Sequence, residues 1–226
     1  MSVPVLAIDG PSGSGKGTLA QMLAQHLNWH LLDSGALYRV LGLAAVERGV
    51  ALDDEPVLAA LAENLPIEFA STRLGEPAAV LLDGRDISQA VRSETAGSYA
   101  SRVAVFPAVR SGLLARQRAF ARAPGLVADG RDMGTEVFRT APLKIFLTAT
   151  AEERARRRYK QLIDKGESVN LAALLEDIRA RDARDSTRAV APLIPAPDAV
   201  VIDSTALDLE QVFQRVLELL KAKQFI

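Results

Sequence analysis

A glycine-rich stretch near the start of the chain, GPSGSGKGT (Gly10–Thr18), constrains the fold more than any other part of the sequence. It follows the apolar run VPVLAI (Val3–Ile8), which predicts a buried strand, and it leads into a segment of helical period that ends near Leu27. Glycines let successive backbone N–H groups turn inward and bind an anion, and the positive end of a following helix adds to that attraction. Lys16 supplies a mobile cation for the β- and γ-phosphates of a nucleotide, which a merely flexible Gly/Ser turn would not explain. The residues expected to hold a polyphosphate are Gly10, Pro11, Ser12, Gly13, Ser14, Gly15, Lys16, Gly17 and Thr18.

The loop departs from the usual pattern at one position. Phosphate loops commonly place Ser or Thr directly after the lysine, where the hydroxyl meets Mg²⁺. Here Gly17 intervenes and Thr18 follows. This GKGT variant resembles the loop of nucleoside monophosphate kinases more than that of GTPase switches or motor ATPases. Thr18 is therefore expected near the metal, either as a direct ligand or through a water molecule.

Alternating strands and helices predict a mostly parallel sheet with helices on both faces. The predicted buried strands are Val3–Ile8, His30–Leu32, Leu126–Ala128, Leu143–Leu147 and Ala199–Ile202. Helical periodicity is found at Leu19–Leu27, Val109–Ala121 and Leu209–Leu220. Ligands of such sheets collect beyond the carboxyl ends of the strands, where the glycine loop lies. We expect a single α/β domain of 226 residues in three layers, with a core of about residues 1–60, 105–150 and 190–226.

Two sections interrupt the alternation. Short strands at Ile67–Ala70 and Ala79–Leu82, with the turn-rich STRLGEP (Ser71–Pro77) between them, predict a small antiparallel insertion over roughly residues 64–92. It lies within an inserted section of about residues 61–104. The second section, Arg154 to Ser168, is charged and is expected to be irregular, with DKGES (Asp164–Ser168) as a helix-breaking loop. Neither section resembles a linker between independent domains.

Composition limits the classes of partner. Lys and Arg number 27 against 28 Asp and Glu, so the chain lacks the basic excess of a general nucleic-acid binder. The absence of cysteine removes disulfides, thiolate zinc sites and cysteine nucleophiles, and fits a reducing compartment. The only histidines, His26 and His30, lie in the apolar HLNWHLL and are expected to be structural. No signal-peptide pattern opens the chain, and no apolar run approaches the roughly 18 residues of a membrane span. We expect a cytoplasmic protein, monomeric because nothing in the sequence requires self-association, that binds neither nucleic-acid polymers nor membranes.

The tetrapeptide Asp-Gly-Arg-Asp occurs twice, in LLDGRDIS (Leu81–Ser88) and VADGRDMG (Val127–Gly134), but the flanks do not match as a true repeat would. In the first copy, Asp83–Gly84 follows a short strand and predicts a hairpin turn. The second copy ends a core strand, where ligands bind. Its Asp129 is expected to hold hydrated Mg²⁺, while Arg131 and Asp132 would contact the acceptor of a phosphoryl group.

Phosphoryl transfer to an anionic acceptor demands arginines, and the sequence has further candidates. Asp33 or Ser34 can cap the helix after the second predicted strand, and Asp33 is open to capping alone or to a further role. Arg39, in the second turn of that helix, can swing back toward a phosphate. Two other segments are crowded with arginine: Arg154, Arg156, Arg157 and Arg158, then Arg179, Arg181, Arg184 and Arg188.

Acidic neighbours offer a simpler explanation for some of these arginines. Glu153 can pair with Arg157, and Arg181 with Asp185, at helical i,i+4 spacing. A solvated salt-bridge face is favoured for Arg156, Arg157 and Arg179. A functional role is favoured for Arg181, Arg184 and Arg188, which are spaced i, i+3, i+7 and would point from one helix face at a common anion.

Taken together, these segments resemble the bacterial type of cytidylate kinase. The motifs that carry the resemblance span nearly the whole chain: IDGPSGSGKGT, WHLLDSGALYR, LVADGRDMGT, KIFLTAT, RDARDS, RAVAPL and VIDST. The resemblance implies a five-stranded parallel sheet of the adenylate kinase sort, an enlarged nucleoside-monophosphate-binding insertion and a short lid over about residues 151–169. It also implies the reaction of ATP with CMP or dCMP, giving ADP and CDP or dCDP, with Mg²⁺.

The resemblance also assigns roles to residues at matching positions. Ser34, Arg39 and Arg131 fall where the family grips the CMP phosphate, and Ser101, Arg110 and Asp132 where it reads the cytosine edge. A carboxylate with nearby donors can tell cytosine from uracil, because cytosine presents an N4 amino donor beside its N3 and O2 acceptors. Asp185 matches a residue near the sugar hydroxyls, and Arg181 and Arg188 match arginines at the phosphates. Lys16, Arg131, Arg181 and Arg188 are the expected catalytic group, and Arg154 and Arg158 the lid arginines at the donor nucleotide. Arg184 fits less clearly and stays a lid-side candidate.

Two other functions share part of this pattern. A kinase of shikimate or of another monophosphate would have the same loop and fold, but GRDMGT and RDARDS argue against it. A GTP-binding switch would lack a use for the acceptor arginines, and the sequence has no Asn-Lys-x-Asp motif that reads guanine.

Overall fold

The computed structural model describes residues 3–70, 79–164 and 166–224. Its central sheet has five strands in the order β2-β6-β1-β7-β8, and all of its paired neighbours run parallel. The strands are β1 (Val5–Asp9), β2 (His30–Asp33), β6 (Leu126–Gly130), β7 (Leu143–Thr148) and β8 (Val200–Asp203). Each of the five predicted buried strands is confirmed, with ends that differ by one or two residues.

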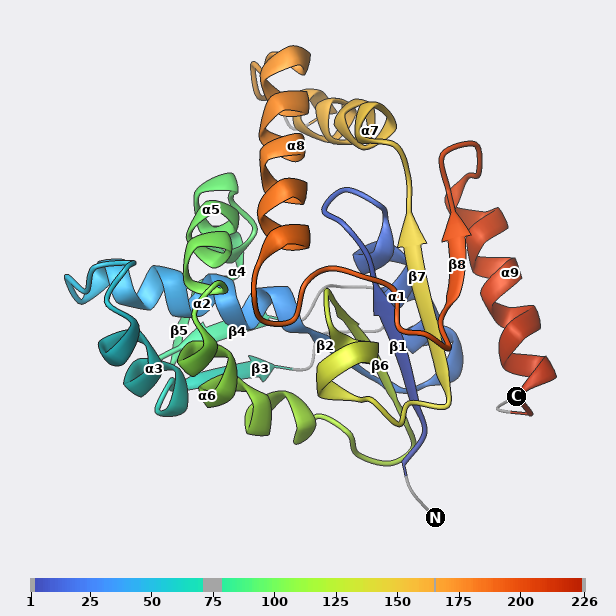
Figure 1. Ribbon diagram of the computed structural model, residues 1–226, viewed down its shortest axis with the longest axis horizontal. Coiled ribbons are helices and arrows are strands. Elements are labelled where there is room, and N and C mark those ends of the chain that lie inside the picture. The colour runs from blue at the N-terminus through green and yellow to red at the C-terminus, as the bar shows by residue number, and fades with distance from the viewer. Residues whose placement is uncertain (1–2, 71–78, 165, 225–226) are drawn as a thin grey trace.

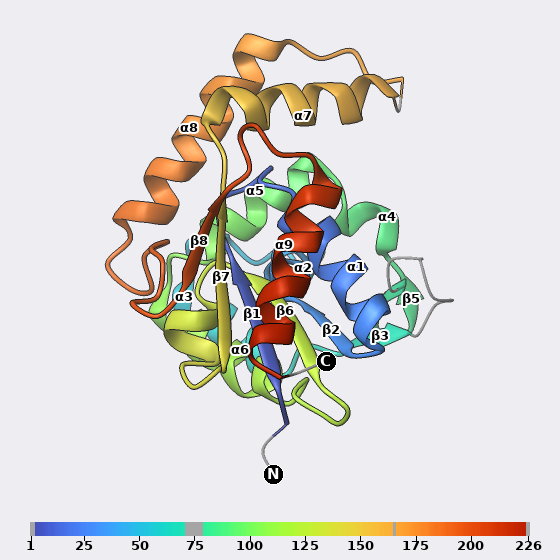
Figure 2. The same ribbon diagram turned by 90° about the vertical axis from the view of Figure 1, so that its right-hand side faces the viewer.

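Helices cover both faces of this sheet, which gives the predicted three layers (Figures 1 and 2). On one face lie α1 (Lys16–Leu27) and α9 (Leu209–Ala222). On the other lie α2 (Ser34–Glu47), α3 (Glu55–Glu63), α5 (Glu94–Val103) and α6 (Pro107–Arg118). Alternation along β1 produces this division, because Leu6 and Ile8 pack toward α1 and α9 while Val5 and Ala7 pack toward α2.

The antiparallel insertion is also present. It consists of β3 (Ile67–Ala70), β4 (Ala79–Leu82) and β5 (Arg85–Asp86), followed by the short α4 (Ser88–Val91). The hairpin turn predicted at Asp83–Gly84 joins β4 to β5, and both residues have positive φ, 51° and 74°, as the tight turn favoured by Asp-Gly requires. The predicted turn at Ser71–Pro77 lies outside the described residues.

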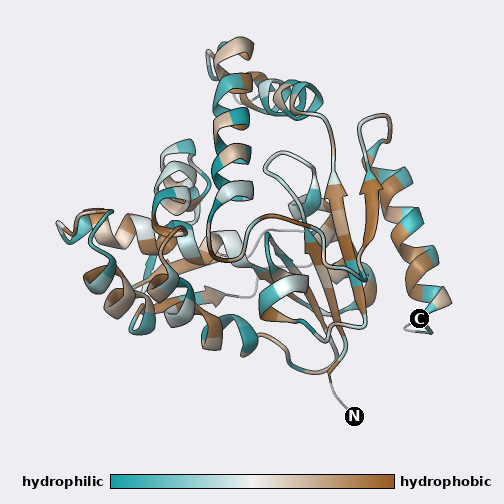
Figure 3. Cartoon of the chain, in the orientation of Figure 1, coloured by the Kyte–Doolittle hydropathy of each residue, from teal (hydrophilic) through white to brown (hydrophobic). Residues whose placement is uncertain are grey.

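The charged section after β7 differs from the prediction. Instead of an irregular segment, α7 (Ala151–Asp164) is continuous and packs against α8 (Leu171–Thr187). Ala155 and Leu162, seven residues apart, are buried on one side of α7, while the remaining face is strongly charged. The helix-breaking loop was correctly expected after Asp164. The two helices stand beyond the carboxyl ends of β7 and β1, and Figure 3 shows that they are more hydrophilic than the strands below them.

One short element was not foreseen. A π-helical turn, η1 (Met133–Val137), follows β6 at the second Asp-Gly-Arg-Asp copy.

The two histidines take structural roles: the ring of His26 packs edge-on against Phe213 at 5.6 Å between centroids, and His30 Nε2 lies 3.0 Å from the Ala123 carbonyl oxygen. No helix of the described residues is both long and apolar enough to cross a membrane.

Candidate active site

The phosphate loop occupies the bend between β1 and α1. Gly10 has φ of 155° and lies so close to β7 that a Cβ there would fall 2.0 Å from the Leu147 carbonyl oxygen. A side chain at this position would therefore push the loop off the sheet. The helix α1 begins at Lys16 without a side-chain cap, which leaves its first amides open toward the loop.

Lys16 is buried beneath this loop. Its Nζ donates to the Pro11 carbonyl oxygen at 3.2 Å. Burial, followed by repulsion from Arg131, lowers the pKa of Lys16 to about 7. A bound anion would reverse that shift, because a negative charge nearby favours the charged lysine.

Asp129, on β6, lies within electrostatic reach of Lys16. Burial raises the pKa of Asp129 to about 6 against the attraction of Lys16. Its Oδ1 is buried and has no hydrogen-bond partner in the described part of the chain. A Cβ on Gly17 would lie 3.2 Å from Asp129 Oδ2, so the glycine after the lysine gives the carboxylate room to approach α1.

This arrangement fits a magnesium ion. Mg²⁺ is usually held by one or two carboxylates, substrate phosphates and several waters rather than by a protein cage. Among the residues that the structure describes, no three His, Asp or Glu side chains gather as a ready-made metal site. The unpartnered Asp129 oxygen matches the sparse protein contribution that Mg²⁺ takes. Thr18 is exposed on the first turn of α1, open to solvent on the side of the loop.

Asp33 and Ser34 connect β2 to α2. Asp33 Oδ1 accepts from the Ala36 amide at 3.0 Å, which confirms the predicted cap. The Asp33 charge also acts on both Lys16 and Asp129, so it lies within the electrostatic reach of the loop. Ser34 is buried and donates to Gln117 Oε1 at 2.8 Å, a partner on α6 that the sequence did not indicate.

A cavity of about 360 Å³ lies between α2, α6 and η1. Asp132 and Arg110, both buried, form an ion pair in its wall. Arg110 also donates to the Ala104 carbonyl oxygen at 3.1 Å, and its guanidinium lies 5.7 Å from the centre of the Tyr38 ring. Gln117 and Glu136 are among the other polar residues of the lining. The cavity thus combines an aromatic face with a carboxylate and a cation.

Arginines connect this cavity to the phosphate loop. Arg131 Nε donates to Asp185 Oδ2 of α8 at 3.0 Å. Burial, followed by repulsion from Arg131, lowers the pKa of Arg181 to about 10. Arg181 Nε and Arg188 Nη2 are both buried without a hydrogen-bond partner in the described residues. Buried cations are costly unless paired, so these side chains together favour an anionic ligand at this point.

The structure brings most of the expected acceptor residues together, but not all. Arg39 lies nearby, with Nη1 3.4 Å from the Val91 carbonyl oxygen. Ser101 is buried on α5. The same helix approaches Arg181 at Gly97, where a Cβ would lie 3.5 Å from Arg181 Nη1. Arg184 is exposed on α8, three residues after Arg181, and its charge acts on that arginine. Because α8 ends at Thr187 and Arg188 continues as extended backbone, the prediction that Arg181, Arg184 and Arg188 share one helix face was wrong for Arg188.

The expected pair of Arg181 with Asp185 is replaced by another. Asp185 bonds to Arg131 instead, since the fold brings the end of β6 beside α8. Burial acts to raise the pKa of Asp185, but Arg131 and Arg181 outweigh it and the pKa is lowered overall.

The lid arginines have partners within the protein. Arg154 is buried, donates to the carbonyl oxygens of Ala149 at 2.9 Å and Ser12 at 3.0 Å, and pairs with Asp182 of α8. It thus supports the phosphate loop from behind. Arg158 pairs with Glu94, which links α7 to α5 across the acceptor side.

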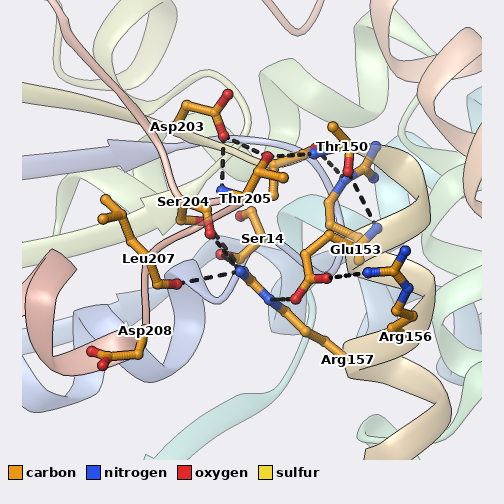
Figure 4. A network of polar contacts seen from close by, with 12 residues as sticks. Ser14, Thr150, Glu153, Arg156, Arg157, Asp203, Ser204, Thr205, Leu207 and Asp208 are labelled. Atoms are coloured by element: carbon orange, nitrogen blue, oxygen red, sulfur yellow. Dashed lines mark hydrogen bonds and ion pairs between the residues drawn. The ribbon is translucent and has the colours of Figure 1, made fainter.

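Arg157 was wrongly assigned to a solvated face. Figure 4 shows its guanidinium between α7, the phosphate loop and the segment after β8. It pairs with Glu153 at 3.1 Å as predicted, but it also bonds to Ser204 Oγ at 3.1 Å and reaches the carbonyl oxygens of Ser14 at 3.4 Å and Leu207 at 3.5 Å. Arg156 and Arg179 do form the expected exposed pairs, with Glu153 and Glu152.

A strand-end glycine loop with a buried lysine, facing a cavity across clustered arginines, defines the class of phosphate-loop kinases. Within that class, the chain belongs to the cytidylate kinase family, whose model matches residues 6–222. A cytidylate kinase of Stutzerimonas stutzeri is 61% identical, with the match covering 95% of this chain and 94% of the relative. A cytidylate kinase of Pseudomonas entomophila is 59% identical, with the match covering 99% of this chain and 98% of the relative. A shikimate kinase structure from Bacteroides thetaiotaomicron is only 14% identical, with a TM-score of 0.46 and coverage of 97% and 99%, and it adds nothing to the assignment.

Proposed function

We propose that this member of the cytidylate kinase family transfers the γ-phosphate of ATP to CMP or dCMP, with the glycine loop as the donor site and the cavity at Asp132 as the acceptor site. The observation that carries the proposal is the set of three cations between the two sites, of which Lys16 is buried and Arg131 and Arg181 are half-buried. Burial, and after it repulsion from Arg131, lowers the pKa of Lys16 and of Arg181. An anion bound between the sites would relieve that repulsion.

The acceptor base would bind in the cavity. Asp132 offers the acceptor oxygen that a cytosine N4 amino group needs, and Arg110 offers donors for N3 or O2. Ser101 would contribute on the α5 side. Ser34, which donates to Gln117 in the structure, would turn its hydroxyl toward the acceptor phosphate, because an ionised phosphate offers only acceptor oxygens.

The acceptor phosphate would lie on Arg39, Arg131 and Arg188, with Asp185 near the sugar. The hydrogen bond from Arg131 to Asp185 fixes the orientation of Arg131. Asp185 would therefore both contact the sugar and orient the arginine that binds the phosphate. Bidentate arginine contacts suit both the ground state and the charge that spreads over the transferred group.

Catalysis would then depend on position and charge rather than on a base. An oxygen of the acceptor phosphate attacks the γ-phosphorus in line. The bond between the γ-phosphorus and the β-γ bridging oxygen breaks, and ADP leaves with the electron pair of that bond. Lys16, the loop amides, Arg131, Arg181 and Arg188 would neutralise the spreading charge. Mg²⁺, held through Asp129 and in reach of Thr18, would supply further neutralisation of the phosphates.

The lid would complete the donor site. Arg154 supports the loop from behind, and Arg158 would turn from Glu94 toward the donor phosphates when α7 and α8 close over the nucleotide. Closure would also exclude water, which otherwise accepts the phosphoryl group.

The test is release of ADP, followed in a coupled assay, with ATP and a panel of acceptors: CMP, dCMP, UMP, AMP, GMP and shikimate. Rapid turnover with CMP or dCMP and little with the others is expected. Turnover of shikimate or of a purine nucleotide in preference would overturn the acceptor assignment. GTP hydrolysis without any acceptor would instead support a nucleotide switch. Cytoplasmic location and a monomeric state remain predictions. Fractionation of cells tests the location, and light scattering of the purified protein tests the oligomeric state.

A further inference from the structure

Asp9, the last residue of β1, has a buried carboxylate with two defined partners. Its Oδ1 accepts from the Met133 amide at 2.8 Å and its Oδ2 from the Gly134 amide at 2.8 Å. These are the first two amides of η1, which a helix cannot satisfy from its own carbonyls. The carboxylate therefore caps the turn that directly follows Arg131 and Asp132.

The remainder of this turn is fixed by other groups. The carbonyl oxygen of Asp132 accepts from the amides of Glu136 at 2.8 Å and Val137 at 3.1 Å. Lys144 of β7 packs its stem behind Gly134, where a Cβ would lie 3.1 Å from Lys144 Cδ. Its Nζ holds the Arg139 carbonyl oxygen at 2.6 Å. With the far end of the turn secured, the near end depends on Asp9.

Asp9 also adjoins the phosphate loop, since Gly10 follows it and is pressed against β7. One residue thus connects the start of the donor loop to the start of the acceptor turn. We infer that Asp9 is a positioning residue, whose carboxylate sets Arg131 and Asp132 in register with the phosphate loop. The inference rests on the proposed function, because it assumes that Asp132 and Arg131 contact the acceptor nucleotide.

The cost of this carboxylate supports a positioning role over simple packing. Burial raises the pKa of Asp9 to about 7, even though the amides of Gly134 and Met133 act to lower it. A group that only filled space would be less costly as an apolar side chain. A carboxylate, by contrast, can accept from two amides at once and so fixes both in one orientation.

The test compares Asp9→Asn with the parent chain. Asparagine has the same shape but one acceptor oxygen, so its NH₂ group would oppose one of the two amides. We expect the KM for CMP to rise roughly tenfold, equivalent to about 1.4 kcal/mol of acceptor binding. The KM for ATP should change less than twofold, and the preference for CMP over UMP should fall.

Asp54→Asn is the matched control. Asp54 is also an aspartate that accepts from a backbone amide at the start of a helix, that of Val57 at 3.3 Å, but it is exposed and caps α3. Its loss should leave both KM values unchanged. Asp9→Ser, which is smaller and keeps one acceptor, serves if the asparagine variant does not fold.

The outcomes separate the possibilities. A parallel rise of both KM values, or a fall in melting temperature with the KM for CMP unchanged in either variant, would overturn the positioning role. Failure of the parent chain to consume ATP with CMP would instead defeat the proposed function itself.

Discussion

Arg131 and Asp185 are joined by a hydrogen bond of 3.0 Å between Nε and Oδ2, which ties the end of β6 to helix α8. The two residues are 54 positions apart in the sequence. The bond makes the orientation of Arg131 depend on the place of α8, and α8 belongs to the pair of helices that stands over the phosphate loop. We therefore expect closure of these helices and binding of the acceptor to be coupled through this ion pair.

Replacement of Asp185 should therefore weaken the acceptor site beyond the loss of one contact. In Asp185→Asn, Arg131 keeps a neutral partner but loses the charge that holds it. A hydrogen bond to a charged group is worth about 1.5–3 kcal/mol, so kcat/KM for CMP should fall by roughly 10- to 100-fold. Asp177→Asn, an exposed change on the same helix, is the control. Steady-state kinetics at saturating ATP measure both, and equal values for the two variants would contradict the coupling.

A second prediction concerns recognition of the cytosine ring of CMP by Asp132. Asp132→Asn exchanges a carboxylate, which accepts from cytosine N4, for an amide that can donate to uracil O4. The ratio of kcat/KM for CMP to that for UMP should fall by roughly 10- to 100-fold, because a mismatched polar contact costs about 1–3 kcal/mol. The variant should also be less stable, since Arg110 stays buried beside it without a charge partner.

The first Asp-Gly-Arg-Asp copy provides the control for this change. Asp86 holds the corresponding position but lies on exposed β5. Asp86→Asn should keep the parent ratio of CMP to UMP. Unchanged selectivity in Asp132→Asn, measured side by side with it, would show that the base binds elsewhere.

The sequence predicted the features that depend on neighbouring residues. The loop Gly10–Thr18, the cap at Asp33 and the turn at Asp83–Gly84 each follow from a few adjacent residues, and each is confirmed. The positions of the five strands along the chain also followed, because buried parallel strands are short apolar runs. The residue ranges given for the core, the insertion and the lid stay predictions.

What the sequence did not reveal depends on distant contacts. Asp9 meets Met133 across 124 positions, and Arg157 meets Ser204 across 47. Spacing within α7 gave Arg157 a partner in Glu153 and so suggested a solvated pair, whereas the fold places it against two other segments. A carboxylate at the end of an apolar strand was the one sequence signal that could have drawn attention to Asp9.

A third prediction uses the titration of Lys16. In the free protein, burial lowers its pKa from 10.5 to about 7, while a bound polyphosphate raises it again. At pH 8 the free lysine is largely neutral, so binding of ATP should take up a proton. Calorimetry in two buffers of different ionisation enthalpy measures that uptake. Lys16→Met should abolish it and lower kcat by several orders of magnitude.

The same shift has a consequence for stability. The unfolded lysine binds a proton up to about 10.5 and the folded one only up to about 7, so the unfolded state holds more protons between these values. The contribution of Lys16 to the free energy of unfolding therefore rises with pH across this window. Denaturation of the parent and of Lys16→Met at pH 7 and pH 9 compares the two slopes. Identical slopes, together with buffer-independent binding enthalpies, would contradict a lowered pKa.

The last prediction concerns the glycine that follows the lysine. In Gly17→Ala, the new methyl group would lie 3.2 Å from Asp129 Oδ2 and press on the carboxylate proposed to hold Mg²⁺. Alanine in a helix is about 1 kcal/mol more favourable than glycine, so the variant should not lose stability from α1 itself. The Mg²⁺ concentration for half-maximal activity should rise severalfold while the KM for CMP stays near the parent value. A magnesium titration of activity at fixed ATP and CMP, beside a thermal melt, separates these effects. If the Mg²⁺ requirement is unchanged in a stable variant, Asp129 does not act through the metal, and the room left by Gly17 needs another explanation.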